Sequence, residues 1–207
     1  MLDFAPMLAT LDERTAPADP HELFALWYDE AQRVVRPEPT AFVLATATDD
    51  GRPSARVLLL KGFEARGFSF YTHYESRKAA ELAANPQAAM LFHWQLLERQ
   101  VRIEGRATRL PAEESDAYFA TRSRASRIGA WASPQSRPIA DRALLEARVA
   151  TLAREHEGRE VPRPAAWGGF LLKPDVFEFW HAGPDRLHDR LRFDRAASSW
   201  SVTRLAP

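Results

Sequence analysis

The sequence predicts a mainly β domain of the α+β class, built as an antiparallel barrel with helices around it. Short stretches rich in β-branched and aromatic residues are joined by turn residues, which is typical of antiparallel β architectures. Strands and helices do not alternate along the chain, and this argues against a doubly wound parallel sheet. The sequence contains neither GxGxxG nor a P-loop, so a Rossmann or nucleotide-triphosphatase fold has no support.

The composition is that of one globular domain. The chain has 207 residues, of which 45% are hydrophobic and 27% charged, and this length is enough to bury a substantial core. Its 28 basic and 28 acidic side chains cancel, so no overall field marks a protein that binds nucleic acid or a membrane surface. No apolar run approaches the roughly 20 residues that span a bilayer, and the first residues lack the basic flank of a signal peptide. We therefore expect a cytoplasmic protein.

Cysteine is absent and the six histidines are scattered. The lack of cysteine excludes disulfides, thiolate nucleophiles and cysteine-ligated metals. No HExxH pair or similar metal-ligand spacing occurs, so we expect no metal site. Any affinity for anions has to come from local clusters of the basic side chains.

The domain is expected to begin after a flexible arm. Residues 1–18 lack periodicity, so they form the predicted arm and residues 19–207 a single domain. Asp19 can cap a helix that has Pro20 at its first position. This helix is expected to stop before Pro37.

The middle of the chain alternates predicted strands with turns. A hairpin is expected around the Asp-Gly turn at 49–51, and Ser76 can cap a helix at 77–85. The predicted strands lie at 40–48, 55–63, 67–74, 88–94 and 99–110. The last of them alternates apolar and polar residues, which predicts a sheet with one buried and one polar face.

The last third of the chain contains two predicted helices and several short strands. The helices lie at 111–122 and 141–158, and the segment between them, 123–139, is expected to be irregular. The closing strands are predicted at 170–173, 176–181, 190–193 and 199–205.

Two basic pairs lie where an anion could be held. Arg77 and Lys78 fall in the first turn of a helix, against the positive end of its macrodipole, and a bound phosphate would remove that conflict. Arg56 and Lys61 lie at the two ends of an apolar strand, where alternation places them on opposite faces. They can serve one ligand only across a bulge, two sheet faces or two subunits. Arg77 and Lys78 are equally compatible with side chains that extend into water, and Arg56 and Lys61 with the charged ends of a buried strand.

Two polar segments could complete such a site. The first surrounds a helix end and a proline-flanked turn, and its side chains can hydrogen-bond a phosphate or a heteroaromatic ring. These side chains are Tyr118, Arg122, Ser126, Gln135 and Ser136. In the second segment Trp180 ends a strand, and Arg186 and His188 share parity on the next one. An aromatic ring beside an arginine and an imidazole suits a flat anionic ligand. The same pattern is equally compatible with an exposed edge strand.

A series of motifs runs from about residue 38 to Pro207: RVLLLKGF, GFSFYTHYESRKAAELAANP, LERQVRIEG, the YFATR to GAWASPQS segment, WGGF, EFW, RLHDR and the terminal RLAP. In this order they closely resemble the pyridoxine/pyridoxamine 5'-phosphate oxidase family. The resemblance implies a split-barrel flavoprotein, a homodimer that holds FMN in clefts at the subunit interface. Such an interface would let Arg56 and Lys61 contribute to one site.

The resemblance also assigns roles to individual residues. By similarity, the FMN-binding residues are Arg56, Val57, Leu58, Leu59, Leu60, Lys61, Tyr71, Thr72, Arg77, Lys78, Gln100, Gln135, Ser136, Trp180 and Arg190. The substrate-binding residues are Lys61, Tyr118, Arg122, Ser126, Arg186 and His188. The first four of these would surround the substrate phosphate. Arg186 and His188 would lie over the pyridine ring as the catalytic residues.

The implied reaction converts pyridoxine 5'-phosphate or pyridoxamine 5'-phosphate to pyridoxal 5'-phosphate. No side chain can accept the hydride, so FMN would take it, and O2 would reoxidise the flavin and yield H2O2. Two alternatives stay open: a split-barrel FMN oxidase of another ring, as in phenazine biosynthesis, and a non-catalytic flavin- or haem-binding split barrel. Four positions depart from the family pattern and leave the substrate preference open: His73, Ser123, Arg127 and His181.

Overall fold

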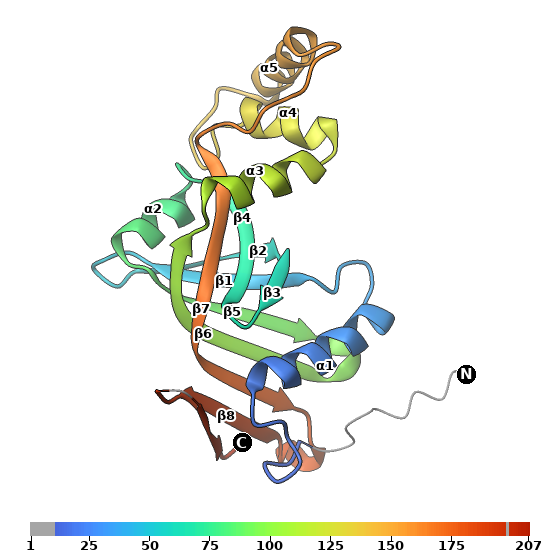
Figure 1. The fold of residues 1–207 in the computed structure, drawn as a ribbon, viewed down its shortest axis with the longest axis vertical. Helices are drawn as coiled ribbons and strands as arrows, with labels where there is room; N and C mark the ends of the chain where they lie inside the picture. Colours follow the sequence, from blue (N-terminus) through green and yellow to red (C-terminus); the bar gives the residue numbers. More distant parts are fainter. Residues whose placement is uncertain (1–10, 198) are drawn as a thin grey trace.

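The computed structural model describes residues 11–197 and 199–207, so the expectation of flexibility for residues 1–10 lies outside it. Among the described residues the strands form one nine-stranded antiparallel sheet in the order β2-β1-β5-β6-β7-β4-β3, with β8 between β7 and β9. The sheet curls around its core (Figure 1). The predicted antiparallel α+β class is confirmed. The strands are β1 (Ala41–Ala47), β2 (Pro53–Leu59), β3 (Gly62–Glu64), β4 (Gly67–His73), β5 (Gln87–Trp94), β6 (Arg99–Arg109), β7 (Trp167–His181), β8 (Asp189–Arg195) and β9 (Trp200–Arg204).

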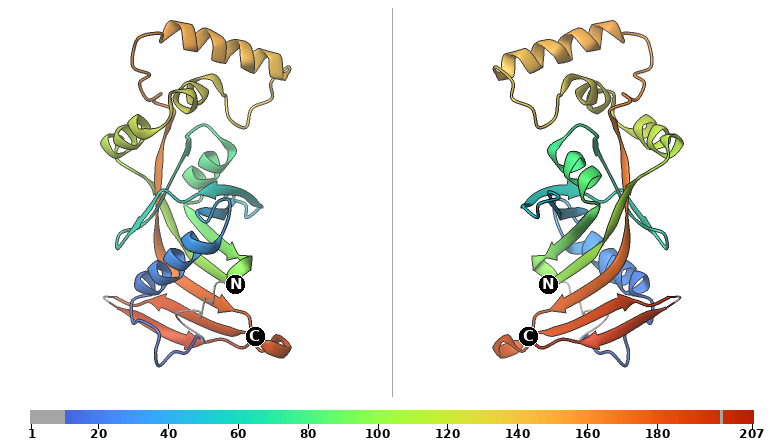
Figure 2. Two further views of the ribbon diagram at one scale, coloured as in Figure 1. Left: turned by 90° about the vertical axis from the view of Figure 1, so that its right-hand side faces the viewer. Right: turned by 90° about the vertical axis from the view of Figure 1, so that its left-hand side faces the viewer.

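The helices lie against the sheet and at one end of it. Figures 1 and 2 show α3 to α5 stacked at the end opposite to β8. The helices are α1 (Pro20–Val34), α2 (Arg77–Ala84), α3 (Ala112–Thr121), α4 (Arg124–Ala132) and α5 (Arg142–Glu155), with 3-10 turns η1 (Gln95–Leu97) and η2 (Pro184–Arg186). Nowhere in the described ranges is a helix long and apolar enough to cross a membrane.

Helix α1 fills the curl of the sheet with aromatic side chains. Asp19 caps the helix as predicted, by accepting a hydrogen bond from the backbone N–H of His21 (2.9 Å). The Phe24 ring lies 4.8 Å from Phe68 and 5.2 Å from Phe92. Because these rings come from α1, β4 and β5, one side of the helix joins distant strands into a single core.

Strand β7 connects the two ends of the molecule. Its first residues, 167–172, pair with β4, and its last residues, 176–181, pair with β8, while β6 runs along its other side. The sequence predicted two short strands here because Pro174 interrupts the apolar run. In the structure Pro174 pairs with Gly105 at a register shift in β6, and a bulge is a place where a sheet tolerates proline. A Cβ on Gly105 would lie 2.0 Å from the Lys173 carbonyl oxygen, so this position requires glycine.

Two other predicted boundaries were wrong. The predicted strand 55–63 is two strands, because the backbone N–H of Leu60 donates to Thr40 and that of Lys61 to Ser69. The chain thus changes partners between these residues, from the edge before β1 to β4. The segment 123–139, predicted to be irregular, contains α4, which Ser123 caps by accepting a hydrogen bond from the Ser126 N–H.

The second half of the expected N-terminal arm packs onto the C-terminal strands. Leu11 is buried in the core with 3% of its surface exposed. Arg204 of β9 donates to the Leu11 carbonyl (2.9 Å) and pairs with Glu13 (2.6 Å) and Asp189 (2.6 Å). The Arg204 clamp, defined by these four residues, therefore ties the first described residues to β8 and β9.

Candidate active site

The first group of predicted site residues converges at the start of α2. The Lys78 ammonium donates to the side-chain oxygens of Gln135 (2.8 Å), Thr72 (3.0 Å) and Ser76 (3.3 Å). Ser76 holds the N-cap position, but its hydroxyl accepts from Lys78 instead of capping the helix. Burial, together with the charge of Arg56, lowers the pKa of Lys78 to about 8. Lys78 is thus a buried cation whose hydrogen-bond partners among the described residues are neutral oxygens.

Glu81 organises the two arginines beside Lys78. Its carboxylate is 5% exposed and lies 2.8 Å from Arg77 Nε and 3.3 Å from Arg56 Nη2. Burial raises the pKa of Glu81, but hydrogen bonds from Ser54, Thr46 and Arg77 outweigh it and lower the pKa to about 2. One buried carboxylate therefore orients two cations, and with Lys78 the group carries a net positive charge. We call Arg56, Arg77, Lys78 and Glu81 the α2 cluster.

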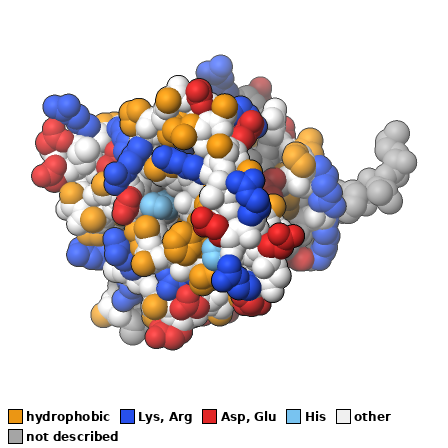
Figure 3. All heavy atoms as spheres, turned by 90° about the horizontal axis from the view of Figure 1, so that it is seen from above, with side chains coloured by type: hydrophobic (Ala, Val, Ile, Leu, Met, Phe, Trp, Pro, Cys, Tyr) orange, Lys and Arg blue, Asp and Glu red, His pale blue; other side chains and the backbone are white. Residues whose placement is uncertain are grey.

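A cavity of about 260 Å³ lies next to the α2 cluster. Three predicted site residues line it, and one of them, Gln135, also accepts the hydrogen bond from Lys78. Basic side chains are spread widely over this end of the molecule, between acidic and apolar ones (Figure 3). We call this space the α4 cavity; its lining residues are His73, Arg122, Ser126, Gly129, Ala130, Ser133, Gln135 and Trp167.

Arg122 is held in the α4 cavity by aromatic rings. Its guanidinium carbon lies 4.6 Å from the ring centroid of Trp167 and 5.5 Å from that of Phe119. Burial lowers the pKa of Arg122, and its Nη1 is buried without a hydrogen-bond partner among the described residues. An unpaired buried donor on a cation fits an anionic ligand.

The two predicted tyrosines lie beside the ring of Trp167. Tyr71 and Tyr118 stack with their ring centroids 3.9 Å apart, and Tyr71 also stacks on Trp167 at 5.5 Å. Burial raises the pKa of both phenols, so both stay protonated and can donate a hydrogen bond at neutral pH.

A second group of predicted residues lies at the other end of β7. The rings of Trp180 and His188 are 4.7 Å apart and inclined by 45°. Trp180 pairs with Gln100 of β6 on one side and with Arg190 of β8 on the other. Arg186 is exposed in η2, where it has a φ of 64°. We call Trp180, Arg186, His188 and Arg190 the β8 wall.

Hydrogen bonds fix the orientation of the β8 wall. Arg190 donates to Glu178 Oε1 through Nε (3.0 Å) and Nη2 (2.7 Å), and to the Ala206 carbonyl (2.8 Å). Glu178 is 3% exposed and also pairs with Arg102. His188 Nδ1 accepts a hydrogen bond from the Gly183 N–H (3.2 Å). This bond leaves the proton of the neutral imidazole on Nε2.

One chain does not bring the two groups together. Trp167 of the α4 cavity and Trp180 of the β8 wall are thirteen positions apart on β7, or roughly 40 Å along an extended strand. Figure 2 shows α4 and β8 at opposite ends of the fold. Arg122 and His188 of the same chain therefore cannot touch one small substrate.

The remaining predicted residues lie around the turn from β2 to β3. Val57 is 64% exposed on β2, which lies at the edge of the sheet, and Lys61 is exposed just after it. Leu58 and Leu59 are half-buried, whereas Leu60 points into the core, so only its backbone is available to a ligand. Ser136 is exposed, with a left-handed φ of 70°.

Sequence reasoning missed three residues that hold the predicted ones: Glu81, Trp167 and Glu178. Glu81 had a signal in the sequence, because it follows Arg77 at the i,i+4 spacing of a helical ion pair. Trp167 and Glu178 had none beyond their places in WGGF and EFW, because their partners are set by the fold.

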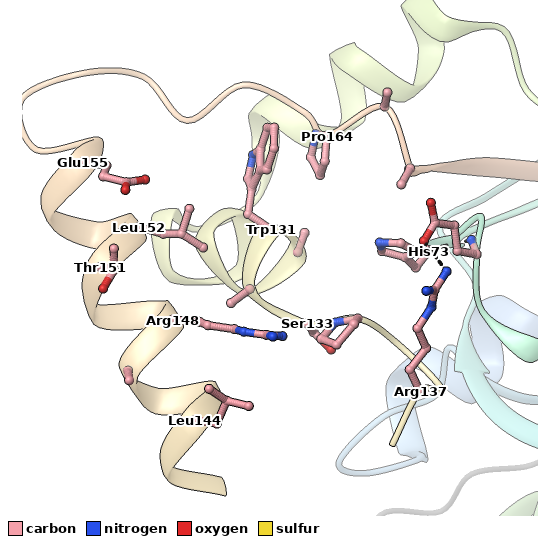
Figure 4. A pocket seen from close by; sticks show the side chains of 17 residues that line it. His73, Trp131, Ser133, Arg137, Leu144, Arg148, Thr151, Leu152, Glu155 and Pro164 are labelled. Atoms are coloured by element: carbon pink, nitrogen blue, oxygen red, sulfur yellow. Dashed lines mark hydrogen bonds and ion pairs between the residues drawn. The ribbon is translucent and has the colours of Figure 1, made fainter. Parts of the chain in front are cut away.

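A larger cavity of about 800 Å³ lies between α4 and α5. Leu144, Arg148 and Leu152 of α5 face Trp131 of α4 across it, as Figure 4 shows. None of the predicted site residues lines this cavity. It shares His73, Ala130 and Ser133 with the α4 cavity, so these residues form the wall between the two spaces.

Comparison with known proteins identifies the family. Residues 28–154 match the family model described as pyridoxamine 5'-phosphate oxidase, and residues 167–207 match the pyridoxine 5'-phosphate oxidase C-terminal dimerisation region. The chain belongs to the pyridoxamine 5'-phosphate oxidase family. The predicted family membership is thereby confirmed, and the second match coincides with β7 to β9 and the β8 wall.

Named relatives and solved structures agree with this family. The chain is 56% identical to a pyridoxine/pyridoxamine 5'-phosphate oxidase of Rubrobacter xylanophilus over 96% of this chain and 92% of the relative. It is 37% identical to PhzG of Burkholderia lata, solved in complex with tetrahydrophenazine-1-carboxylic acid, with a TM-score of 0.90 over 97% and 99% of the two chains. A pyridoxamine 5'-phosphate oxidase-related, FMN-binding protein of Nostoc punctiforme has the same fold, with a TM-score of 0.70 at 20% identity over 93% and 98%. The protein is thus an oxidoreductase of the pyridoxamine 5'-phosphate oxidase family with a flavin-binding split barrel and a dimerisation region.

No metal site emerges from the part of the chain that the structure describes, because no three His, Asp or Glu side chains there converge.

Proposed function

We propose that the protein is a homodimeric FMN-dependent oxidase that converts pyridoxine 5'-phosphate or pyridoxamine 5'-phosphate to pyridoxal 5'-phosphate. The observation that carries this proposal is the separation of the predicted site into two ends of one strand. In a two-fold symmetric dimer, the α4 cavity of one copy can lie against the β8 wall of the other. The symmetry then creates two such sites. The dimerisation region at 167–207 supports this arrangement.

The α2 cluster fits the phosphate of FMN. Arg56, Arg77 and Lys78 supply three cations against the single carboxylate of Glu81, and charge-assisted hydrogen bonds to phosphate are strong. Thr72 and Gln135 lie beside the Lys78 ammonium and complete the polar set. Bound FMN would supply hydride acceptance, with O2 as the terminal oxidant and H2O2 as the by-product.

The substrate phosphate is assigned to the α4 cavity and the pyridine ring to the β8 wall of the other copy. Arg122 offers its unpaired Nη1, Ser126 and Tyr118 offer hydroxyls, and the exposed ammonium of Lys61 adds a fourth group. Across the interface, His188 presents Nε2–H as a donor and Arg186 a guanidinium. These groups hold the ring in one orientation, and alignment of this kind lowers a reaction barrier by several kcal/mol.

A second candidate is oxidation of a phenazine-type ring. It is favoured by the similarity to PhzG, whose structure contains tetrahydrophenazine-1-carboxylic acid. The higher identity to the pyridoxine/pyridoxamine 5'-phosphate oxidase and the unpaired cation of the α4 cavity favour the phosphorylated substrate.

The test begins with the absorption spectrum of the purified protein, which should show bound oxidised flavin. Anaerobic addition of pyridoxine 5'-phosphate should bleach the flavin, and admission of O2 should restore it with formation of pyridoxal 5'-phosphate and H2O2. Bleaching by tetrahydrophenazine-1-carboxylic acid alone would establish the second candidate. A flavin that stays oxidised with every one of these substrates would overturn the oxidase assignment.

A further inference from the structure

We propose that Trp167 is a positioning residue of the α4 cavity, whose indole face carries the Arg122 guanidinium and keeps that cation free of any carboxylate, ready for a phosphate. This inference deepens the proposed function and rests on it for the identity of the phosphorylated ligand. It assigns a role to a residue that belongs to neither predicted set.

Trp167 is itself firmly placed. It is 7% exposed, opens β7 and pairs with His73 of β4. The centroid of the Phe119 ring lies 5.0 Å from that of the indole with the two planes inclined by 66°, and Tyr71 stacks on the indole at 5.5 Å. An indole locked on two sides can hold the guanidinium of Arg122 in one place.

The arginines near α3 show what is unusual about Arg122. Arg66 pairs with Glu114, and Arg163 pairs with Asp116 at 2.6 Å. Both acids belong to α3, whose C-cap is Arg122. Within the described ranges Arg122 makes no ion pair, and Trp167 and Phe119 are its ring contacts. Two of the acids of α3, Glu114 and Asp116, are thus paired with other arginines.

A cation–π contact suits a binding residue better than an ion pair. The indole face attracts a guanidinium without carrying a net negative charge. The full charge of Arg122 therefore remains available, and no carboxylate has to be displaced when the ligand enters. Such a cation binds a dianionic phosphate monoester more tightly than a monoanionic carboxylate, because the attraction scales with the ligand charge.

The test compares Trp167→Leu with Trp167→Phe in the FMN-loaded protein. Calorimetric binding of inorganic phosphate should weaken about tenfold in Trp167→Leu and about threefold in Trp167→Phe, which keeps a weaker aromatic face. The KM for pyridoxine 5'-phosphate should rise by the same factors while kcat changes little. Binding of unphosphorylated pyridoxine should not change, because it does not use Arg122.

Phe170→Leu is the matched control. Phe170 lies three residues further on β7, is 4% exposed and stacks on Phe70 at 5.6 Å, so its loss tests the packing of the strand without touching Arg122. Phosphate affinity should stay at the wild-type value in this variant.

Three outcomes would decide against the role of Trp167. Unchanged phosphate affinity in both Trp167 variants overturns it, and so does unchanged affinity in Trp167→Phe alone if the leucine variant fails to fold. An equal loss in Phe170→Leu would show that packing of the strand, and not the contact with Arg122, matters. If no substrate is oxidised but phosphate binding still weakens in the Trp167 variants, the proposed function fails and the role of Trp167 stands.

Discussion

The two ends of β7 hold their cations in different ways. At the α4 cavity and the α2 cluster, Arg122 lies on aromatic rings and Lys78 is bonded only by neutral oxygens. At the β8 wall, Arg190 is fixed by the buried carboxylate of Glu178, and Arg204 beneath it by Asp189 and Glu13. At the first end Arg122 and Lys78 thus lack a carboxylate partner among the described residues, and Glu81 is shared between Arg56 and Arg77; at the second end carboxylates pair with both arginines.

This difference separates two tasks. Partly buried cations without a carboxylate partner attract phosphate, and the bound phosphate then supplies the negative charge that balances them. Arg190 and Arg204 are paired with carboxylates, and with these partners they form a rigid frame for the rings of Trp180 and His188. We infer that the first end supplies affinity and the second supplies the orientation of a flat ring.

The largest effect on activity is expected for Arg122 and His188, which are proposed to bind one substrate from two different chains. Arg122→Ala and His188→Ala should each lower kcat/KM about a hundredfold, because each removes one contact to the substrate from every site. When the two inactive variants are dissociated and reassembled together, half of the dimers contain one chain of each kind. Each such dimer has one intact site, so the activity should return to about a quarter of wild type.

The control for this experiment is reassembly of each variant with itself, which should recover nothing. If the mixture stays inactive although mixed dimers form, Arg122 and His188 of one chain serve the same site. The proposed division of each site between two chains would then be wrong.

An intermediate effect is expected from the unneutralised Lys78. Because its pKa is about 8 and only the protonated form favours a phosphate, FMN should bind less tightly as the pH rises above 8. Lys78→Met should weaken FMN binding about tenfold and remove this pH dependence. Fluorescence titration of the flavin on both sides of pH 8 measures both changes. A pH dependence that survives in Lys78→Met would assign it to another group.

The lowered pKa of Lys78 also affects the stability of the flavin-free protein. There the free energy of unfolding should increase with pH, whereas the affinity for FMN should decrease. The folded-state pKa of Lys78 lies below its ordinary value of 10.5, so the unfolded chain binds this proton more tightly between about pH 8 and 10.5. The contribution of Lys78 to the free energy of unfolding should therefore rise with pH across that window. Denaturant unfolding of wild type against Lys78→Met isolates this contribution.

The smallest effect is expected at the compensated end. Glu178→Gln should lower the free energy of unfolding by about 1–2 kcal/mol, because it removes a buried acceptor of charged hydrogen bonds, and should weaken FMN retention only a few-fold. Glu104→Gln is the matched control, since Glu104 pairs with the same Arg102 as Glu178 (2.8 Å), but its side chain is 41% exposed. Equal losses of unfolding free energy and FMN retention in the two variants would show that the contact between Glu178 and Arg190 matters no more than the pair of Glu104 and Arg102.

Most of the strands could be predicted from the sequence because their periodicity is local. β1, β4, β5 and β6 lie within about two residues of their predicted ranges, as alternation on a half-buried sheet predicts. The partner change at Leu60 and Lys61 could not be predicted, because it depends on which distant carbonyl, Thr40 or Ser69, meets each N–H. The sequence predicted two strands in place of β7 because proline usually ends a strand. A bulge in the neighbouring strand makes Pro174 tolerable, but the residue opposite to it, Gly105, is about 70 residues away in sequence.

The sequence named candidate site residues but could not name the contacts that hold them. The family resemblance supplied Arg122, Lys78 and Arg190 as ligand-binding residues. What holds them, Trp167 and Glu178 among others, follows from pairings between strands and helices that no local pattern records. Whether a cation is neutralised decides its use, and that property appears only when the fold is known.

The Arg204 clamp has a consequence for how the protein is made. The partner of Leu11 and Glu13 is near the end of the chain, so this contact cannot form while the ribosome is still synthesising β9. Domains generally begin to fold from the amino terminus during synthesis, but the contacts of Arg204 with Leu11 and Glu13 can form only after β9 has left the ribosome. The Arg204 clamp is therefore a late contact, which forms after the strands that precede β9 in the sequence have become available for pairing.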